Sequence, residues 1–144
     1  MAPTRQLHIF MPDKSYVQVA NIGVKEAFDN KYKSSLSGRI KEELTDAVNG
    51  SSKLTTKQPA KKDAEGFYLD GALSLKRTDK GLEAELNLQL ATWPKKAIFG
   101  MAKSKAAVPV SNEARLDRDV NDLVDALLED ASKKALKEFE KRAP

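Results

Sequence analysis

The sequence contains no cysteine and a single histidine. Without cysteine the chain forms no disulfide, no thiolate zinc site and no cysteine nucleophile. One imidazole cannot by itself complete a typical zinc site or a Ser-His-Asp triad. His8 lies in the apolar segment QLHIFM, so we interpret it as a strand residue bonded to backbone or water, not as a catalytic group.

Glycines are few, and their spacing forms no phosphate-binding motif. The seven glycines match neither a P-loop nor a dinucleotide fingerprint, and Gly66, Gly71 and Gly81 are interpreted as strand-entry and turn residues. The aspartates of residues 117–125 loosely resemble a calcium loop, but the glycine and the terminal glutamate of that loop are absent. The sequence therefore predicts no cofactor, no metal site and no enzyme.

Long hydrophobic runs are also lacking. No apolar stretch approaches the roughly 20 residues that a membrane-spanning helix needs, and the amino-terminal segment MAPTRQLHIF is too short for a signal peptide. Two origins are consistent with this amino-terminal segment. Either the chain begins in the cytoplasm, or it is a periplasmic or envelope-associated protein from which a signal or anchor was removed.

The charges are mixed and nearly balanced. Lysine and arginine number 25 against 21 aspartates and glutamates, which gives a net charge of +4. This balance falls short of the concentrated basic patch that marks a nucleic-acid binder. A chain of 144 residues most often forms one domain, so we expect residues 1–144 to be a single domain with an ordered core at about 5–141.

The clearest periodic segment predicts a helix from about Asp119 to Lys141, because its apolar residues recur at i, i+3, i+4 and i+7. Asp117 or Asp119 is the expected N-cap, and lysines favour the opposite end. A second helix is expected over about residues 35–49, where Asn49-Gly50 resembles a left-handed stop.

Two segments with alternating apolar residues, 67–75 and 82–90, flank the sequence Asp-Lys-Gly at residues 79–81. Alternation on both sides of such a turn predicts a β-hairpin with one buried face and one solvated face. Trp93-Pro94 is expected to end the second strand, because proline donates no ladder hydrogen bond.

A third strand is predicted from Ile98, with Pro109 indicating an edge strand or a strand end. One face of it would hold Ile98, Gly100, Ala102, Ser104, Ala106, Val108 and Val110 beneath a helix. The other face would hold Phe99, Met101, Lys103 and Lys105.

The remaining elements are shorter. Residues 6–11 are expected to form a short first strand, Leu54 a short edge strand, and residues 57–65 an exposed loop, while residues 16–24 form an apolar patch without clear periodicity. Strands grouped between flanking helices predict an α+β fold, with both main helices on one face of a mostly antiparallel sheet.

The order of these elements resembles a module of bacterial cell-envelope proteins. KSSLSGRIKEELTDAV resembles the first helix of the amino-terminal domain of TolB, AEGFYLDGALSLKRT the segment that opens its meander, and VNDLVDALLEDASKKAL its closing helix. Related modules include the periplasmic domain of the curli secretion channel, lipoprotein activators of peptidoglycan synthases and small secretion lipoproteins. The resemblance covers residues 5–141 and implies an accessory or assembly role, although this chain has no lipobox cysteine.

Two chemical alternatives accompany that expectation. Glu83 and Glu85 share a strand face, where two carboxylates can act as an acid–base pair, but a solvated hairpin face explains them more simply. A small basic nucleic-acid-binding domain is the main alternative, because bases stack on aromatic rings while lysines neutralise phosphates. The lysines concerned are Lys95, Lys96, Lys103 and Lys105, near Trp93 and Phe99. They alternate as solvent-facing strand residues do, and lysines on an exposed sheet edge also discourage aggregation.

Phe99 and Met101 are expected on the sheet face away from the helices, unless residues 16–24 fold over them. Exposed apolar residues rimmed by lysine mark a partner surface. The sequence therefore predicts a non-enzymatic protein-interaction, assembly or accessory subunit of a bacterial cell-envelope or secretion system, with homo-oligomers through the sheet edge included. The candidate partner-binding residues are Trp93, Phe99, Met101, Lys95, Lys96, Lys103 and Lys105.

Overall fold

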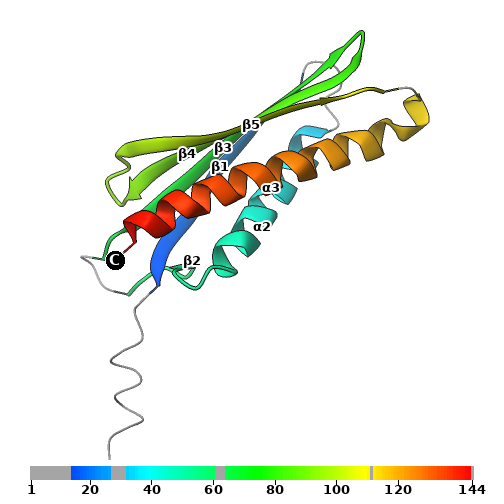
Figure 1. Ribbon diagram of the computed structural model, residues 1–144. Coiled ribbons are helices and arrows are strands. Elements are labelled where there is room, and N and C mark those ends of the chain that lie inside the picture. Colours follow the sequence, from blue (N-terminus) through cyan, green and yellow to red (C-terminus); the bar gives the residue numbers. More distant parts are fainter. Residues whose placement is uncertain (1–13, 27–31, 61–63, 111, 144) are drawn as a thin grey trace, which may run out of the picture.

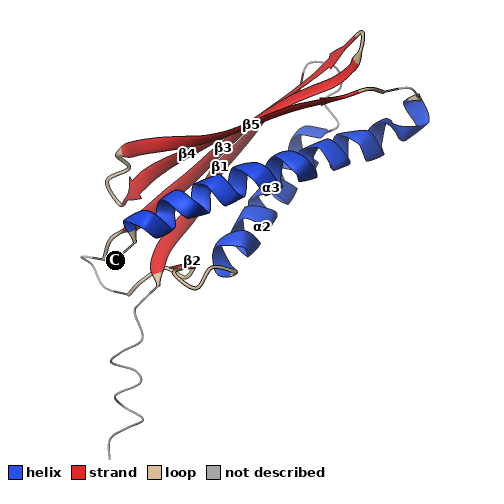
Figure 2. Ribbon diagram, viewed as in Figure 1, coloured by secondary structure: helices blue, strands red, loops and turns tan. Residues whose placement is uncertain are grey.

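The computed structural model describes residues 14–26, 32–60, 64–110 and 112–143. Within them, five strands form one sheet and two α-helices cover one of its faces (Figure 1, Figure 2). The elements in chain order are β1 (Ser15–Glu26), α2 (Lys33–Asn49), β2 (Leu54–Thr55), β3 (Gly66–Thr78), β4 (Gly81–Trp93), β5 (Ile98–Val108), the 3-10 helix η2 (Glu113–Arg115) and α3 (Leu116–Arg142). The predicted α+β class is confirmed.

The strand order across the sheet is β2-β1-β3-β4-β5. β3, β4 and β5 form the predicted antiparallel meander, which makes the sheet mostly antiparallel. β1 pairs in parallel with both β2 and β3, since α2 carries the chain back to the same end of the sheet. α2 packs mainly on β1, and α3 packs on β4 and β5.

β1 differs from the sequence prediction, which leaves residues 16–24 without a defined element. Its register with β3 shifts between Val19 and Ile22, because two residues of β1 lie opposite Asp70. This bulge exchanges the faces of the strand, so no single alternating pattern runs through it. The Asp70 carboxylate accepts a hydrogen bond from the Asn21 backbone N–H at 3.1 Å. The predicted strand at residues 6–11 lies outside the described residues.

The β3–β4 hairpin confirms the alternating pattern. Its predicted inward residues are all buried against the helices. Gly81, which closes the turn opposite Thr78, has a φ of +145°, and a Cβ there would lie 2.1 Å from the Val108 carbonyl oxygen. Glycine is therefore required at this position by backbone conformation and by the close approach of the chain that leaves β5.

The two helices bury the faces that their periodicity predicts. In α3 the buried residues are Val120, Leu123, Val124, Leu127, Leu128, Ala131, Ala135 and Phe139. In α2 they are Leu36, Ile40, Leu44 and Val48. None of the described helices is long and apolar enough to cross a membrane.

The helix ends differ in detail from the prediction. α3 is preceded by η2, and Asn112 caps that turn by accepting the Ala114 N–H at 2.9 Å. Asp117 and Asp119 lie within the first turn of α3, where they complement the helix dipole without being the N-cap. Gly50 ends α2 in a right-handed conformation with φ −76°, so the expected left-handed stop is absent.

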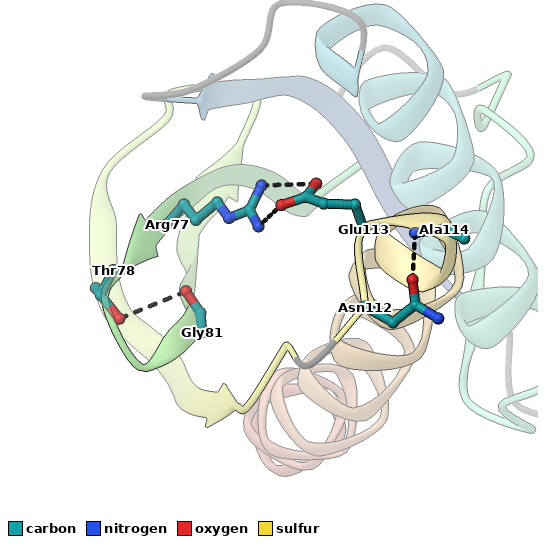
Figure 3. Close-up of polar contacts among 6 residues, drawn as sticks. All are labelled: Arg77, Thr78, Gly81, Asn112, Glu113 and Ala114. Carbon is teal, nitrogen blue, oxygen red and sulfur yellow. Dashed lines mark hydrogen bonds and ion pairs between the residues drawn. The ribbon is translucent and has the colours of Figure 1, made fainter.

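An ion pair joins the β3–β4 hairpin to η2, the turn that precedes α3. The Arg77 guanidinium donates both of its terminal NH2 groups to the Glu113 carboxylate, one of them at 3.0 Å (Figure 3). The hydrogen bond from Arg77 lowers the pKa of Glu113 below its ordinary value. The pair is open to solvent, so it serves to orient the start of α3 more than to stabilise the core.

We expect Gly81→Ala to lower the free energy of unfolding by about 2 kcal/mol or more, because alanine is strained at a positive φ and collides with the Val108 carbonyl. Gly38→Ala is the matched control, since an added Cβ at Gly38 meets nothing within 4 Å. In an exposed helix this change raises stability by about 0.5–1 kcal/mol. Urea unfolding monitored by circular dichroism measures both. Equal stabilities for the two variants would contradict the turn geometry.

The Glu113 carboxyl should titrate at a lower pH in the wild type than in Arg77→Gln, because the variant removes the hydrogen bond that favours the ionised form. The stability that this pair contributes is present above the pKa of an unfolded glutamate and is lost as pH falls through the folded pKa. Carbon-detected NMR titration of the side-chain carboxyl measures the midpoint. An unchanged midpoint in the variant would show that the pair does not form in solution.

Candidate protein-interaction surface

A bulge in the β4–β5 pairing decides which residues of β5 face the helices. The register shifts between Leu90 and Ala91, which leaves Phe99 without a partner residue on β4. An extra residue of this kind exchanges the two faces of a strand. Phe99 therefore lies on the helix side, whereas Ile98 lies beside Met101 on the uncovered side, here called the open face. The prediction that Phe99 and Met101 share a face was wrong for this reason.

Phe99 is half-buried under the carboxyl-terminal end of α3. Its ring centroid lies 6.1 Å from that of Phe139 on α3 and 5.8 Å from that of Phe67 on β3, both in edge-on contact. The rings of Phe67 and Phe139 stack at 4.7 Å. The Arg142 guanidinium covers the outer side of Phe99, 4.0 Å from its centroid. Phe99 therefore packs against the hydrophobic core beneath the end of α3.

Ile98 and Met101 remain uncovered. Their side chains are 60% and 55% exposed, and they are the exposed large hydrophobic residues of the described part of the chain. Ile98 lies opposite Ala91 and Met101 opposite Gln89, in two neighbouring rows of the open face. Exposed apolar residues that adjoin one another are typical of a binding surface.

Lys96 borders this pair from the turn between β4 and β5. It has a φ of 58°, and its N–H donates to the Thr92 carbonyl at 2.7 Å. Its ammonium lies 3.2 Å from the Asp70 carboxylate and 5.4 Å from the centre of the Tyr68 ring. We call Tyr68, Lys96, Ile98 and Met101 the open-face patch.

Trp93 is half-buried at the end of β4. Its indole N–H donates to the Gln18 side-chain oxygen at 3.2 Å, and its ring meets Tyr16 edge-on with 4.8 Å between centroids. Burial raises the pKa of the Tyr16 hydroxyl, and the neighbouring Tyr68 raises it further, so Tyr16 stays protonated near neutral pH. Two residues of β1 thus hold Trp93 in a fixed orientation.

The other candidate lysines are exposed but not gathered into one basic patch. Lys103 and Lys105 point from the open face of β5, with Lys105 opposite Glu85. Lys95 lies in the β4–β5 turn. The Lys134 ammonium of α3 donates to the Lys103 carbonyl oxygen at 3.0 Å, which occupies part of the sheet edge.

The structure also places the carboxylates considered for acid–base chemistry. Glu83 lies opposite Lys76 of β3, and Glu85 lies opposite Lys105 of β5. Each carboxylate thus faces a lysine of the next strand, as on a solvated sheet face. Within the described residues, no group of three or more histidine, cysteine, aspartate or glutamate side chains could hold a metal ion.

Sequence reasoning missed several members of this surface. The alternation of residues 67–75 predicts no more for Tyr68 and Asp70 than a place on the solvated face of the hairpin, and the pattern of the third strand predicts Ile98 on the face beneath a helix. The alternation in β3 does place Tyr68 and Asp70 on the open face. The contact of Lys96 with both depends on the turn conformation, which the sequence pattern does not reveal.

No protein-family model matches the sequence, and no curated protein matches it. A solved structure of a Xanthomonas campestris protein of the family model DUF330 has a TM-score of 0.55 at 10% identity, covering 90% of this chain and 89% of that chain. A hypothetical protein from Chlamydia trachomatis has a TM-score of 0.48 at 14% identity, covering 90% and 95%. A candidate neuraminyllactose-binding hemagglutinin homolog from Helicobacter pylori has a TM-score of 0.46 at 13% identity, covering 92% and 96%. The chain thus shares its fold with the Xanthomonas protein.

Proposed function

We propose that the protein is a non-enzymatic accessory or assembly subunit that binds a partner protein through the open-face patch. The observation that carries this proposal is the uncovered pair Ile98 and Met101, at 60% and 55% exposure, on the sheet face that no described helix covers. Covering both side chains removes apolar surface from water, which is the main favourable term in protein association.

The chemistry of β5 indicates what kind of partner surface fits. The strand IFGMAKSKAAV carries two lysines and no acidic residue. Lys103 and Lys105 follow the apolar pair along the same face of the strand. A complementary partner presents an apolar centre with carboxylates at its rim, because opposite charges steer association and fix the orientation of the complex.

The proposed setting is a bacterial cell-envelope or secretion system. This part rests on the resemblance of residues 33–48, 64–78 and 120–136 to the TolB-type module. The fold shared with the Xanthomonas protein is compatible with that setting but assigns no activity, because function belongs to sites and not to folds.

The contacts of the basic segment favour a protein partner over nucleic acid. Lys96 is paired with Asp70, and Glu83 and Glu85 lie on the same face as Lys103 and Lys105. Trp93 is held edge-on by Tyr16 and is only partly open for base stacking. A phosphate backbone would meet carboxylates as well as ammonium groups along this face.

The test compares Ile98→Asp/Met101→Asp with Ala107→Asp. Ala107 is an exposed residue of the same strand and face, so its variant adds a carboxylate away from the patch. Each tagged protein is crosslinked in envelope and soluble fractions, and the captured partner is then purified and titrated by calorimetry. We expect the double variant to bind the partner at least about thirtyfold more weakly, as for a buried anchor, and Ala107→Asp to bind like the wild type.

Two results would contradict the proposal. One is a partner that binds wild type and double variant equally. The other is a wild type that is monomeric by light scattering, captures no partner, and binds mixed-sequence DNA or RNA with an affinity that falls steeply between ~50 and ~200 mM salt. The second result would establish the nucleic-acid alternative. A self-associating wild type that the double variant renders monomeric would identify a second copy as the partner.

A further inference from the structure

A second feature lies at the end of the sheet where β4 ends and α3 finishes. A cleft of about 620 Å³ opens there, between the start of β3, the β4–β5 turn and the last turn of α3. This volume falls within the roughly 300–1,000 Å³ of small-molecule sites. The lining residues that matter to its chemistry are Glu65, Phe67, Thr92, Trp93, Lys95 and Arg142.

The apolar walls of the cleft are held in place before any ligand enters. Phe67 is buried and stacks on Phe139 at 4.7 Å. Trp93 is fixed by its hydrogen bond to Gln18 and by edge-on contact with Tyr16. Phe67 lies on the helix side and Trp93 on the open face, and both line the cleft at the end of the strands. Side chains that are already fixed can contact an apolar group at little cost in side-chain entropy.

Two cations at the rim have no hydrogen-bond or ion-pair partner among the described residues. Arg142 lies with its guanidinium over Phe99, and no hydrogen bond or ion pair joins its N–H groups to another described residue. Lys95, in the β4–β5 turn, is likewise unpaired there. The stacking on Phe99 restrains the guanidinium plane, which leaves the N–H groups at its edge able to donate to a ligand.

The charge at this rim selects the class of ligand. Arg142 and Lys95 contribute two positive charges and Glu65 one negative charge, so these three side chains have a net charge of +1. A singly charged anion neutralises this net charge, whereas a dianion leaves an excess negative charge. A guanidinium binds a carboxylate through two parallel N–H···O bonds. We propose that this cleft binds a small carboxylate with a flat apolar body, the carboxylate on Arg142 and Lys95 and the body against the lining that Phe67, Thr92 and Trp93 contribute.

This site is separate from the open-face patch. Neither Ile98 nor Met101 lines the cleft, and Arg142 belongs to the opposite face of the sheet through its contact with Phe99. The inference therefore does not depend on the proposed function. Ile98→Asp/Met101→Asp should retain carboxylate binding, and Arg142→Gln should retain partner binding.

The experiment uses Trp93, the single tryptophan of the chain, as a fluorescent reporter in the cleft wall. The full chain is titrated with hydrocinnamate, with the neutral hydrocinnamamide of the same shape, and with phenyl phosphate. The variants are Arg142→Gln and Lys95→Gln. Arg118→Gln is the matched control, since Arg118 is an exposed arginine near the other end of α3.

We expect a saturable fluorescence change with hydrocinnamate, and binding of the amide weaker by about tenfold or more, because it lacks the charge-assisted hydrogen bonds. Arg142→Gln and Lys95→Gln should each weaken hydrocinnamate binding by about tenfold, with no change in Arg118→Gln. Circular dichroism checks that each variant is folded. If Arg142→Gln does not fold, the hydrocinnamate affinity of Lys95→Gln is compared with that of the wild type instead.

Several results would overturn this inference. Equal affinity for the acid and the amide would show that the cleft does not recognise charge. Tighter binding of phenyl phosphate would show that it selects a phosphate. Wild-type affinity in folded Arg142→Gln would show that this cation serves only the carboxyl-terminal carbonyls of α3, and a titration without saturation would show that no such site exists.

Discussion

Each side chain of a strand is committed to one face of its sheet, so one inserted residue exchanges the faces beyond it. In β5 that inserted residue is Phe99, and the register shift opposite it sends its ring beneath α3. The same shift brings Ile98 to the face of Met101. A strand with strict alternation would bury Ile98 and expose Phe99, and neither the aromatic cluster at Phe139 nor the open-face patch would form.

The two surfaces of the domain follow from this arrangement. On the helix side, the Phe99 ring lies under the Arg142 guanidinium, 4.0 Å from it, and so holds this cation at the rim of the cleft. On the open side, the turn that leads into β5 carries Lys96 to Asp70, whose other carboxylate oxygen accepts from the β1 bulge. Asp70 thus links the β1 bulge to the turn between β4 and β5.

Much of the fold could be predicted from the sequence wherever one period continues without interruption. The eight buried positions of α3 and the inward leucines of the hairpin are the predicted ones, because burial selects apolar residues at regular spacing. The sequence pattern does not predict β1, because the bulge at Asn21 interrupts the alternation of buried and exposed residues along the strand. Its parallel pairing with β3 joins segments far apart in the chain, and local patterns do not contain that pairing. The predicted face of Phe99 is wrong for the same reason, because the bulge in β5 depends on how that strand pairs with β4.

The bulge in β5 places Ile98 and Met101 on the open face and Phe99 on the helix side. Because the sequence contains no cysteine, single cysteine variants can measure the exposure of each position directly. Single variants Ile98→Cys, Phe99→Cys and Met101→Cys of the folded protein are labelled with a thiol reagent, and their rates are compared with those of the unfolded chains. The structure predicts fast labelling at positions 98 and 101 and slower labelling at 99. Protection at 98 with fast labelling at 99 would show a strand without the bulge and would contradict the account.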